Sequence, residues 1–417
     1  MKRPVVHVIG AGVGGLSAAR ALLDSRACEV VLHEARGRPG GRRRSFPDET
    51  LGCNFDTGAF ALLSCWPATL ALIDTIGARP EWRVEERPGV AFADLATGER
   101  WRITPNRGRL PWWLLAPRRR GPKLRFADFW CARRLLDAAP EATVASVAPK
   151  GAAMERLWRP LTLAALNCPP ESASARLLGA LCREIVEAGG DGLKVLTPTR
   201  GFGRAFVEPL ARSLERDGAT LRFGRRLIGL ALEPQRVVGL DFEHDRLDLG
   251  SRDGVVLATP WATTAALAPG TTPPETPSAA LTIHYAAAPA PAAPAVVGVL
   301  NGPFDWLFGH ADHISVTIKN AGARLDAPRE SLAAECWRPV AALHGLSDSL
   351  PSWRVAPSRR AAALATPDET ARRPLCRTAW RNLFLAGGHV GRNLPDGLEN
   401  AARSGKAAGE AWFMENR

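Results

Sequence analysis

The residues whose types and spacing most clearly predict chemistry are the glycines of the first turn. Gly10, Gly12 and Gly15 fit the pattern G-x-G-x-x-G and directly follow the apolar run 5–9. That run is typical of a strand, and the Ala-rich residues after Gly15 are typical of a helix. In such a unit the glycines permit a tight turn, backbone approach to a pyrophosphate, and close packing of helix on strand. The start of the helix also favours phosphate, so the sequence predicts a dinucleotide site.

An acid follows at the spacing that a dinucleotide site needs. A second apolar strand, residues 29–33, ends at Glu34, 19 residues after Gly15. A carboxylate there can accept hydrogen bonds from an adenosine ribose. The alternative is a glycine-rich turn that binds no ligand.

Two further loops extend the candidate site. Residues 35–45 contain Gly40, Gly41 and Arg42, where the glycines allow close backbone approach and the arginine could pair with a phosphate. A basic surface turn is the alternative. Residues 55–60 form a small-residue loop that could lie flat against a planar ring.

Length and composition predict a globular protein of two or three domains. The chain has 417 residues, is 46% hydrophobic, and carries a formal net charge of +12. That charge suits an anionic partner, although a solvated arginine-rich surface is an equal alternative. The eight cysteines form no C-x-x-C pair, and no apolar run approaches the ~18 residues of a membrane span. We therefore expect reduced thiols and a cytoplasmic protein.

The middle of the chain is rich in tryptophan and arginine. Residues 107–126 alternate aromatic and aliphatic side chains with cationic ones, including Trp112, Trp113 and Arg118–Arg120. Such a segment could anchor the protein to the inner face of an anionic membrane as a peripheral protein. It could also be an ordinary loop whose tryptophans pack on the core, or bind single-stranded nucleic acid. We expect this segment to contact an anionic membrane, and we expect the protein not to bind nucleic acid.

The C-terminal segment repeats the strand–glycine–helix order. Residues 380–386 are typical of a strand, Gly387 and Gly388 follow, and a small-residue helix begins near Leu398. Asp396 and Glu399 have the spacing of a capping box at the start of that helix. The start of the helix would favour an anionic ligand.

These motifs together resemble the FAD-binding signature of the amine oxidase/phytoene desaturase superfamily. The resemblance rests on the glycine turn, on Glu34-Ala35-Arg36 and on Gly40-Gly41-Arg42. It implies FAD as cofactor and backbone contact between Leu227 and the adenine. The residues that it implies for cofactor binding are Gly10, Gly12, Gly14, Gly15, Glu34, Ala35, Arg36, Gly41, Arg42, Thr57, Gly58, Ala59, Leu227, Gly387, Gly388 and Leu398.

Within the superfamily, residues 157–175 resemble one group, the hydroxysqualene dehydroxylases of hopanoid synthesis. Their pattern is L-W-x-P-L-x-x-A-A-L-N-x-P-P-E-x-A-S-A, and from the residues alone it is an apolar helix followed by a second helix that opens at Pro170. The resemblance implies an apolar isoprenoid substrate and reductive removal of the hydroxyl of hydroxysqualene to give squalene. It identifies no catalytic acid and no electron donor.

The chain departs from the superfamily pattern at two places. The superfamily has A-G-D-W-T followed by T-G-L-P-A-T-I-E-G-A, whereas Gly388 here replaces the acid that contacts the ribityl and phosphate region. Ala59-Phe60 also replaces Gln-His. Two alternatives therefore stay open. One is a polyprenoid desaturase or amine oxidase, of which the latter is disfavoured by the single tyrosine, Tyr285; the other is a flavin-poor partner in a polyprenoid complex.

The predicted architecture is α/β, with a Rossmann-like FAD-binding domain and an inserted α+β substrate domain. The FAD-binding domain takes residues 1–69, 198–265 and 375–417, and the substrate domain takes residues 70–197 and 266–374, with a helical, membrane-facing part. His310, Asp312 and His313 have no further ligand cluster nearby in the sequence, so we expect no metal site.

Overall fold

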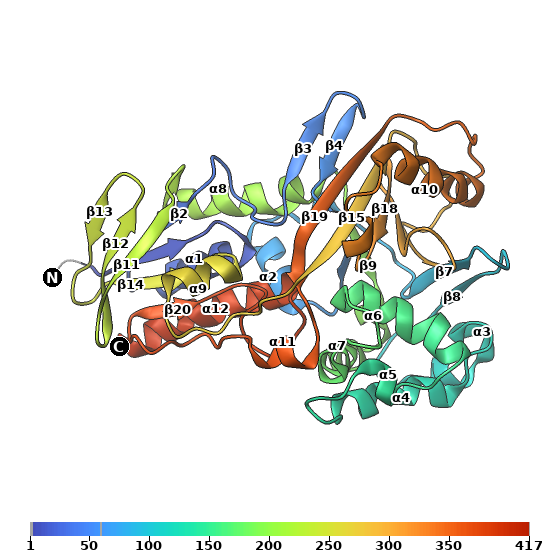
Figure 1. The fold of residues 1–417 in the computed structure, drawn as a ribbon, viewed down its shortest axis with the longest axis horizontal. Helices are drawn as coiled ribbons and strands as arrows, with labels where there is room; N and C mark the ends of the chain where they lie inside the picture. Colours follow the sequence, from blue (N-terminus) through green and yellow to red (C-terminus); the bar gives the residue numbers. More distant parts are fainter. Residues whose placement is uncertain (1–2, 59–60, 417) are drawn as a thin grey trace.

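The computed structural model describes residues 3–58 and 61–416 and contains a five-stranded parallel sheet (Figure 1). The strands lie in the order β10-β2-β1-β14-β20, and every neighbouring pair is parallel. Their bounds are β1 (Val5–Ile9), β2 (Glu29–Glu34), β10 (Thr220–Phe223), β14 (Gly254–Leu257) and β20 (Leu383–Leu385). Segments from both ends and the middle of the chain therefore build one sheet.

Alternate side chains of this sheet enter two different cores. Val6, Val8 and Val256 pack with the helices α1 (Val13–Ser25), α8 (Glu208–Arg216) and α12 (Leu398–Glu415). Ile9, Val255 and neighbouring alternate residues pack instead with a three-stranded antiparallel sheet, made of β11 (Leu227–Glu233), β12 (Arg236–Phe242) and β13 (Arg246–Asp248). Both faces of the parallel sheet are thus covered, which confirms the Rossmann-like prediction.

A second region is built on a mixed seven-stranded sheet, in the order β19-β15-β18-β17-β16-β7-β8 (Figure 1). Only the pairing of β16 with β7 is parallel. The strands are β7 (Val90–Asp94), β8 (Arg100–Ile103), β15 (Pro277–Tyr285), β16 (Val296–Leu300), β17 (Trp306–Gly309), β18 (Ile314–Ile318) and β19 (Trp353–Ala363).

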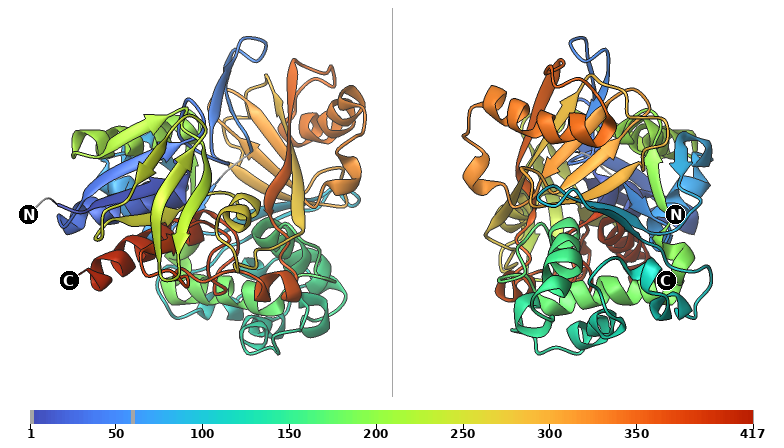
Figure 2. Two further views of the ribbon diagram at one scale, coloured as in Figure 1. Left: turned by 60° about the vertical axis from the view of Figure 1, so that its left-hand side comes forward. Right: turned by 90° about the vertical axis from the view of Figure 1, so that its right-hand side faces the viewer.

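Helices cover this mixed sheet on both sides (Figure 2). Leu307 and Val316 pack with α10 (Arg329–His344), whereas Phe92, Trp306 and Phe308 pack with a helical layer. That layer contains α4 (Phe126–Leu136), α5 (Val144–Val147), α6 (Arg159–Leu166) and α7 (Ala175–Ala188). The α+β prediction for this region is confirmed.

The fold also contains several short elements. They are the hairpin β3 (Ser45–Asp48) and β4 (Cys53–Asp56), the small sheet β5 (Leu62–Leu63), β9 (Val195–Pro198) and β6 (Trp82–Val84), and the helices α2 (Pro67–Thr75), α3 (Pro117–Arg120), α9 (Trp261–Leu267) and α11 (Pro367–Ala371). The domain limits stay a prediction. Across the described residues we find no helix with both the length and the apolarity to cross a membrane.

One helix start was predicted wrongly. Helix α6 ends at Leu166, where Asn167 takes a left-handed conformation (φ 50°), but the next helix begins at Ala175 rather than Pro170. The N–H groups of Ser172 and Ala173 both donate to Pro169 O (3.1 and 2.9 Å), so residues 170–172 form a turn, and Ser174 then forms a β-bridge with Thr143 before the helix begins.

Candidate functional site

The glycine turn is packed tightly at Gly10, Gly14 and Gly15, where an added Cβ would lie 3.0 Å or less from neighbouring backbone atoms. At Gly15 a Cβ would lie 1.9 Å from the carbonyl oxygen of Gly10, and at Gly14 a Cβ would lie 3.0 Å from the Cα of Gly387. Gly10 has φ +106°, a conformation that favours glycine. The first turn of α1 is therefore in direct contact with the loop after β20, which is distant in sequence.

The start of α1 is open. Gly12 is its N-cap and forms no side-chain cap hydrogen bond, and the first turn has no acidic residue. A Cβ at Gly12 would meet nothing within 4 Å among the described residues. Free N–H groups at an uncapped helix start, with open space beside them, form an anion site.

Glu34 lies at the edge of this turn. Its carboxylate accepts hydrogen bonds from the N–H groups of Ala11 (2.8 Å) and Arg36 (3.0 Å). The N–H of Arg225 donates to the backbone oxygen of Glu34 (2.9 Å), two residues before Leu227 begins β11. The structure thus brings the glycine turn, Glu34 and Leu227 together, with Ala35 and Arg36 exposed beside them.

The loop of Gly40, Gly41 and Arg42 lies against the same turn. The N–H of Gly40 donates to Ala11 O (2.8 Å), and a Cβ at Gly41 would lie 3.3 Å from the Cα of Gly12. Arg42 forms a bidentate ion pair with Asp396, through Nη1–Oδ2 (2.9 Å) and Nη2–Oδ1 (2.6 Å). The partner of Arg42 is therefore a carboxylate whose spacing from Glu399 predicts a helix cap.

The capping-box prediction for Asp396 and Glu399 is wrong. The N-cap of α12 is Gly397, without a side-chain cap. Glu399 accepts hydrogen bonds from the N–H groups of Ala68 (3.0 Å) and Thr69 (2.9 Å), so it caps α2 instead. The spacing was right for a capping box, but both carboxylates reach partners on other elements, which local sequence does not show.

The loop after β4 is fastened beside Arg42. Thr57 donates its hydroxyl to Arg42 O (2.9 Å), and the buried carboxylate of Asp56 accepts the N–H of Phe202 (2.9 Å). Burial raises the pKa of Asp56 to about 6. Gly58 is buried, whereas the predicted site residue Ala59 lies outside the described residues.

The loop after β20 closes the site from the other side. Ser404 accepts the N–H of Gly387 (2.9 Å) and donates to its carbonyl (2.8 Å), while Arg373 and Asn400 donate to the carbonyl of Gly388. Leu398, the first residue of α12, is buried in the core of the parallel sheet. Sequence reasoning missed Arg373 and Asn400 because their role is to hold a loop remote in sequence.

His389, in the same loop, is an orphaned polar group. Burial lowers the pKa of its imidazole to about 4, so it is neutral at pH 7. Its Nε2 is buried and has no hydrogen-bond partner among the described residues. The site therefore contains hydrogen-bonding groups, His389 Nε2 and the N–H groups at the start of α1, that have no protein partner among the described residues and could bind a ligand.

A buried histidine chain lies between β4 and the mixed sheet, and sequence reasoning did not find it. Ser315 Oγ lies 2.8 Å from His284 Nδ1 and 2.9 Å from His310 Nε2, and His284 Nε2 lies 3.0 Å from Asp56 O. Burial lowers the pKa of His284 to about 3, so its ring is neutral. These residues connect the mixed sheet to the loop that carries Thr57.

At the surface end of that chain, His313 Nδ1 lies 2.7 Å from Asp312 Oδ1, and Cys53 is the third possible ligand atom within 4.8 Å. The thiol comes from β4, which is far from His313 in the sequence, so local pattern could not predict this grouping. The expectation of no metal stays a prediction.

Comparison with known proteins assigns the class. The family model of flavin containing amine oxidoreductases matches residues 13–291 and 297–411. The glycine turn and the uncapped start of α1 could hold the phosphate of a flavin cofactor. The fold and the site therefore define a flavin-dependent oxidoreductase.

Two relatives place the chain more finely. It is 39% identical to a hydroxysqualene dehydroxylase of Rhodopseudomonas palustris, over 99% of both chains, and 37% identical to one of Sinorhizobium fredii, over 98% of both. The chain belongs to the hydroxysqualene dehydroxylase family.

Solved structures confirm the fold alone. A putative protoporphyrinogen oxidase from Exiguobacterium has a TM-score of 0.70 at 17% identity. The match covers 100% of this chain and 99% of the chain of that structure. Cyclohexylamine oxidase from Brevibacterium oxydans also has a TM-score of 0.70, at 16% identity and with the same coverage.

Proposed function

We propose that this protein binds FAD and removes the hydroxyl group of hydroxysqualene to give squalene. The observation that carries the proposal is the likeness to hydroxysqualene dehydroxylases over nearly the whole of both chains. Glu34 supports FAD in particular, because a buried acid beside the glycine turn is placed for the adenosine ribose that FAD carries.

The reaction balances with reduced flavin as the reductant. Reduced FAD, when bound, would supply the hydride that the allylic carbon accepts. The carbon–oxygen bond would break with its electron pair on oxygen, and a proton would convert the departing group to water. The protein must hold the apolar substrate away from water, so that the allylic carbon accepts the hydride and does not react with water.

Amine oxidation is less consistent with the structure. An aromatic cage for an amine would need an accessible ring, but the single tyrosine, Tyr285, is fully buried and donates its hydroxyl to Ala333 O (2.8 Å). It packs on Trp337 within the core of the mixed sheet. The only tyrosine is thus committed to the core.

The test is a single turnover without oxygen. Purified protein is loaded with FAD, photoreduced, and mixed with hydroxysqualene. We expect the flavin to be oxidised as one equivalent of squalene forms. Protein that stays colourless after incubation with FAD would contradict the cofactor, and flavin that stays reduced without squalene would contradict the substrate.

We propose further that residues 107–130, the basic aromatic surface, contact an anionic membrane from which an apolar substrate can enter. Leu110, Trp112, Leu115 and Trp130 are 79%, 53%, 74% and 62% exposed. Arg107, Arg109, Arg118 and Arg125 are exposed among them. Exposed aromatic and aliphatic groups beside arginines suit a lipid surface with anionic headgroups.

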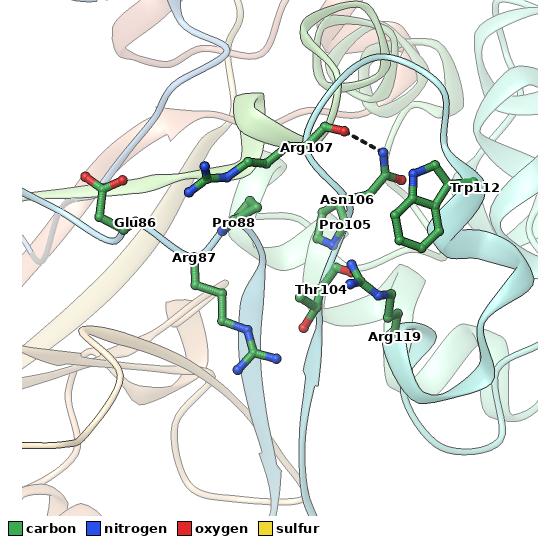
Figure 3. Close-up of a pocket in the computed structure, with 9 residues that line it drawn as sticks. All are labelled: Glu86, Arg87, Pro88, Thr104, Pro105, Asn106, Arg107, Trp112 and Arg119. Atoms are coloured by element: carbon green, nitrogen blue, oxygen red, sulfur yellow. Dashed lines mark hydrogen bonds between the residues drawn. The ribbon is translucent and has the colours of Figure 1, made fainter.

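Two surface pockets border this surface. One, of about 410 Å³, is lined by Trp112, Arg119 and Arg87 among others (Figure 3). The guanidinium of Arg119 lies 4.7 Å from the centre of the Trp112 ring. The other, of about 520 Å³, is lined by Trp130, Arg133 and Arg134. Each pocket is lined by arginine and by an exposed indole, and these groups can contact an anionic headgroup and an acyl chain.

Liposome sedimentation tests the membrane proposal. Reversing Arg118, Arg119 and Arg120 to glutamate should weaken binding to phosphatidylglycerol vesicles, with little binding of either protein to phosphatidylcholine vesicles. Reversal of the exposed Arg212, Arg329 and Arg338 is the matched control. Equal sedimentation of the two triple variants would contradict the proposal.

A further inference from the structure

Gly388 stands where the superfamily pattern has an acid, and its surroundings are unusual for a glycine. A Cβ at Gly388 would lie 2.0 Å from Asp396 Oδ1, 3.0 Å from Arg42 Nη2 and 3.1 Å from Gly397 O. The φ angle of Gly388 is not in the left-handed region, so backbone conformation does not demand glycine there. What excludes a side chain is the carboxylate of Asp396.

Asp396 is held in this position by three hydrogen bonds. Oδ2 accepts from Arg42 Nη1 (2.9 Å) and from the N–H of Ala363 (2.9 Å), while Oδ1 accepts from Arg42 Nη2 (2.6 Å). The Asp396 side chain is 3% exposed. Although burial opposes ionisation, the charges of Arg42 and Arg373 hold its pKa below the usual range, so the carboxylate is charged at neutral pH.

The position of the pair relates it to the flavin site. Arg42 follows Gly41, which lies against Gly12 at the open start of α1, and Gly388 follows Gly387, which lies against Gly14. The Arg42 side chain is 36% exposed even with its carboxylate partner. Oδ1 uses one of its two lone pairs on Arg42, so it keeps the capacity to accept a further hydrogen bond.

We propose that Asp396 is the acid of the flavin site, and that its carboxylate, reaching in from the start of α12, replaces the one absent at residue 388. In this arrangement Asp396 accepts a hydrogen bond from the polyol portion of FAD and orients Arg42 toward the phosphates. The charge has moved eight positions along the chain, from 388 to 396, while its place in the fold is kept.

A swap of the two residues tests this directly, with FAD affinity as the readout. Asp396→Ala should raise the Kd for FAD, measured by flavin fluorescence on apoprotein, by about 10-fold or more, as expected for loss of a hydrogen bond to a charged group. Gly388→Asp alone should also raise the Kd, because its Cβ overlaps the Asp396 carboxylate and two like charges meet. The double variant Gly388→Asp/Asp396→Ala should restore the Kd to within about threefold of wild type.

Thermal unfolding of the apoproteins separates binding from structure. Asp326→Ala is the control, since Asp326 forms an exposed ion pair with Arg359 (2.9 Å) and should leave the Kd unchanged. If Asp396→Ala proves too unstable to titrate, Asp396→Asn is used in its place. A Kd that Asp396→Ala or Asp396→Asn leaves unchanged would overturn the inference, as would a double variant that recovers melting temperature without recovering affinity.

The inference rests on the proposed use of FAD, and the two can fail separately. Wild-type protein that binds FAD but forms no squalene would contradict the substrate and leave the role of Asp396 intact. Wild-type protein that binds FAD while the swap fails to restore affinity would contradict the role of Asp396 alone.

Discussion

The contact between α1 and α12 and the basic aromatic surface of residues 107–130 use their side chains in opposite ways. At the contact, backbone meets backbone: a Cβ at Gly405 would lie 2.1 Å from Gly14 O. On the basic aromatic surface, long side chains such as Leu110 and Leu115 extend into solvent. Steric exclusion therefore dictates glycine at the α1–α12 contact. On the basic aromatic surface the residue types depend instead on the solvent, lipid or partner that contacts them.

The largest expected effect comes from the glycine turn. Gly15→Ala would force a Cβ to within 1.9 Å of a backbone oxygen, and we expect a cost of about 3 kcal/mol, at the upper end of the usual range for overpacking. Gly12→Ala is its matched control, because Gly12 has φ −76° and open space beside it. In urea unfolding we expect Gly15→Ala to be severely destabilised and Gly12→Ala to be near wild type. Gly12→Ala should instead lose FAD affinity, so equal unfolding of the two would contradict this account.

Glu399 extends the comparison to a polar contact of α12. Its carboxylate caps α2 and pairs with Arg403 (2.7 Å) while 7% exposed. Glu399→Ala should lower the free energy of unfolding by ~2–4 kcal/mol, because two N–H groups and a guanidinium lose their acceptor. Glu410→Ala, which removes an exposed pair with Lys406, should cost less than ~0.5 kcal/mol. Equal costs would show that Glu399 is not the cap of α2.

The two adjacent tryptophans of the basic aromatic surface separate packing from exposure. Trp113 packs edge-on against Phe129, with ring centres 5.1 Å apart, whereas Trp112 is 53% exposed. Trp113→Ala should cost ~1–3 kcal/mol in unfolding, and Trp112→Ala less than ~1 kcal/mol. In sedimentation with anionic vesicles, Trp112→Ala should lose more binding than Trp113→Ala. If only Trp112→Ala lost stability, the conclusion that Trp113 is the packed tryptophan and Trp112 the exposed one would be contradicted.

The pH dependence of stability sharpens the role of the Arg42–Asp396 pair. The folded-state pKa of Asp396 is depressed, so its contribution to stability is present above the unfolded value of ~3.9 and is lost as the pH falls through and below it. We expect Asp396→Asn to flatten the fall of melting temperature below about pH 4. If the melting temperature fell identically below about pH 4 in wild type and variant, the Arg42–Asp396 pair would not contribute to folding stability.

Much of the fold and part of the site could be predicted from local pattern. The run before Gly10 and the acid at Glu34 are one short unit, and their geometry is set within about 30 residues. The histidine chain could not be predicted, because His284, His310 and Ser315 meet across different strands of the mixed sheet. Trp112 and Trp113 carry the same residue type, so only packing could distinguish them.

By itself, the sequence determined the parallel-sheet unit and the dinucleotide turn, because a strand, three glycines and a helix constrain one another through backbone sterics. Only the tertiary structure decided where the carboxylates go. Asp396 and Glu399 have the spacing of a local cap, yet one pairs with Arg42 and the other caps α2. A charged group takes the partner that best compensates its burial, and here both partners lie more than 300 positions away in the sequence.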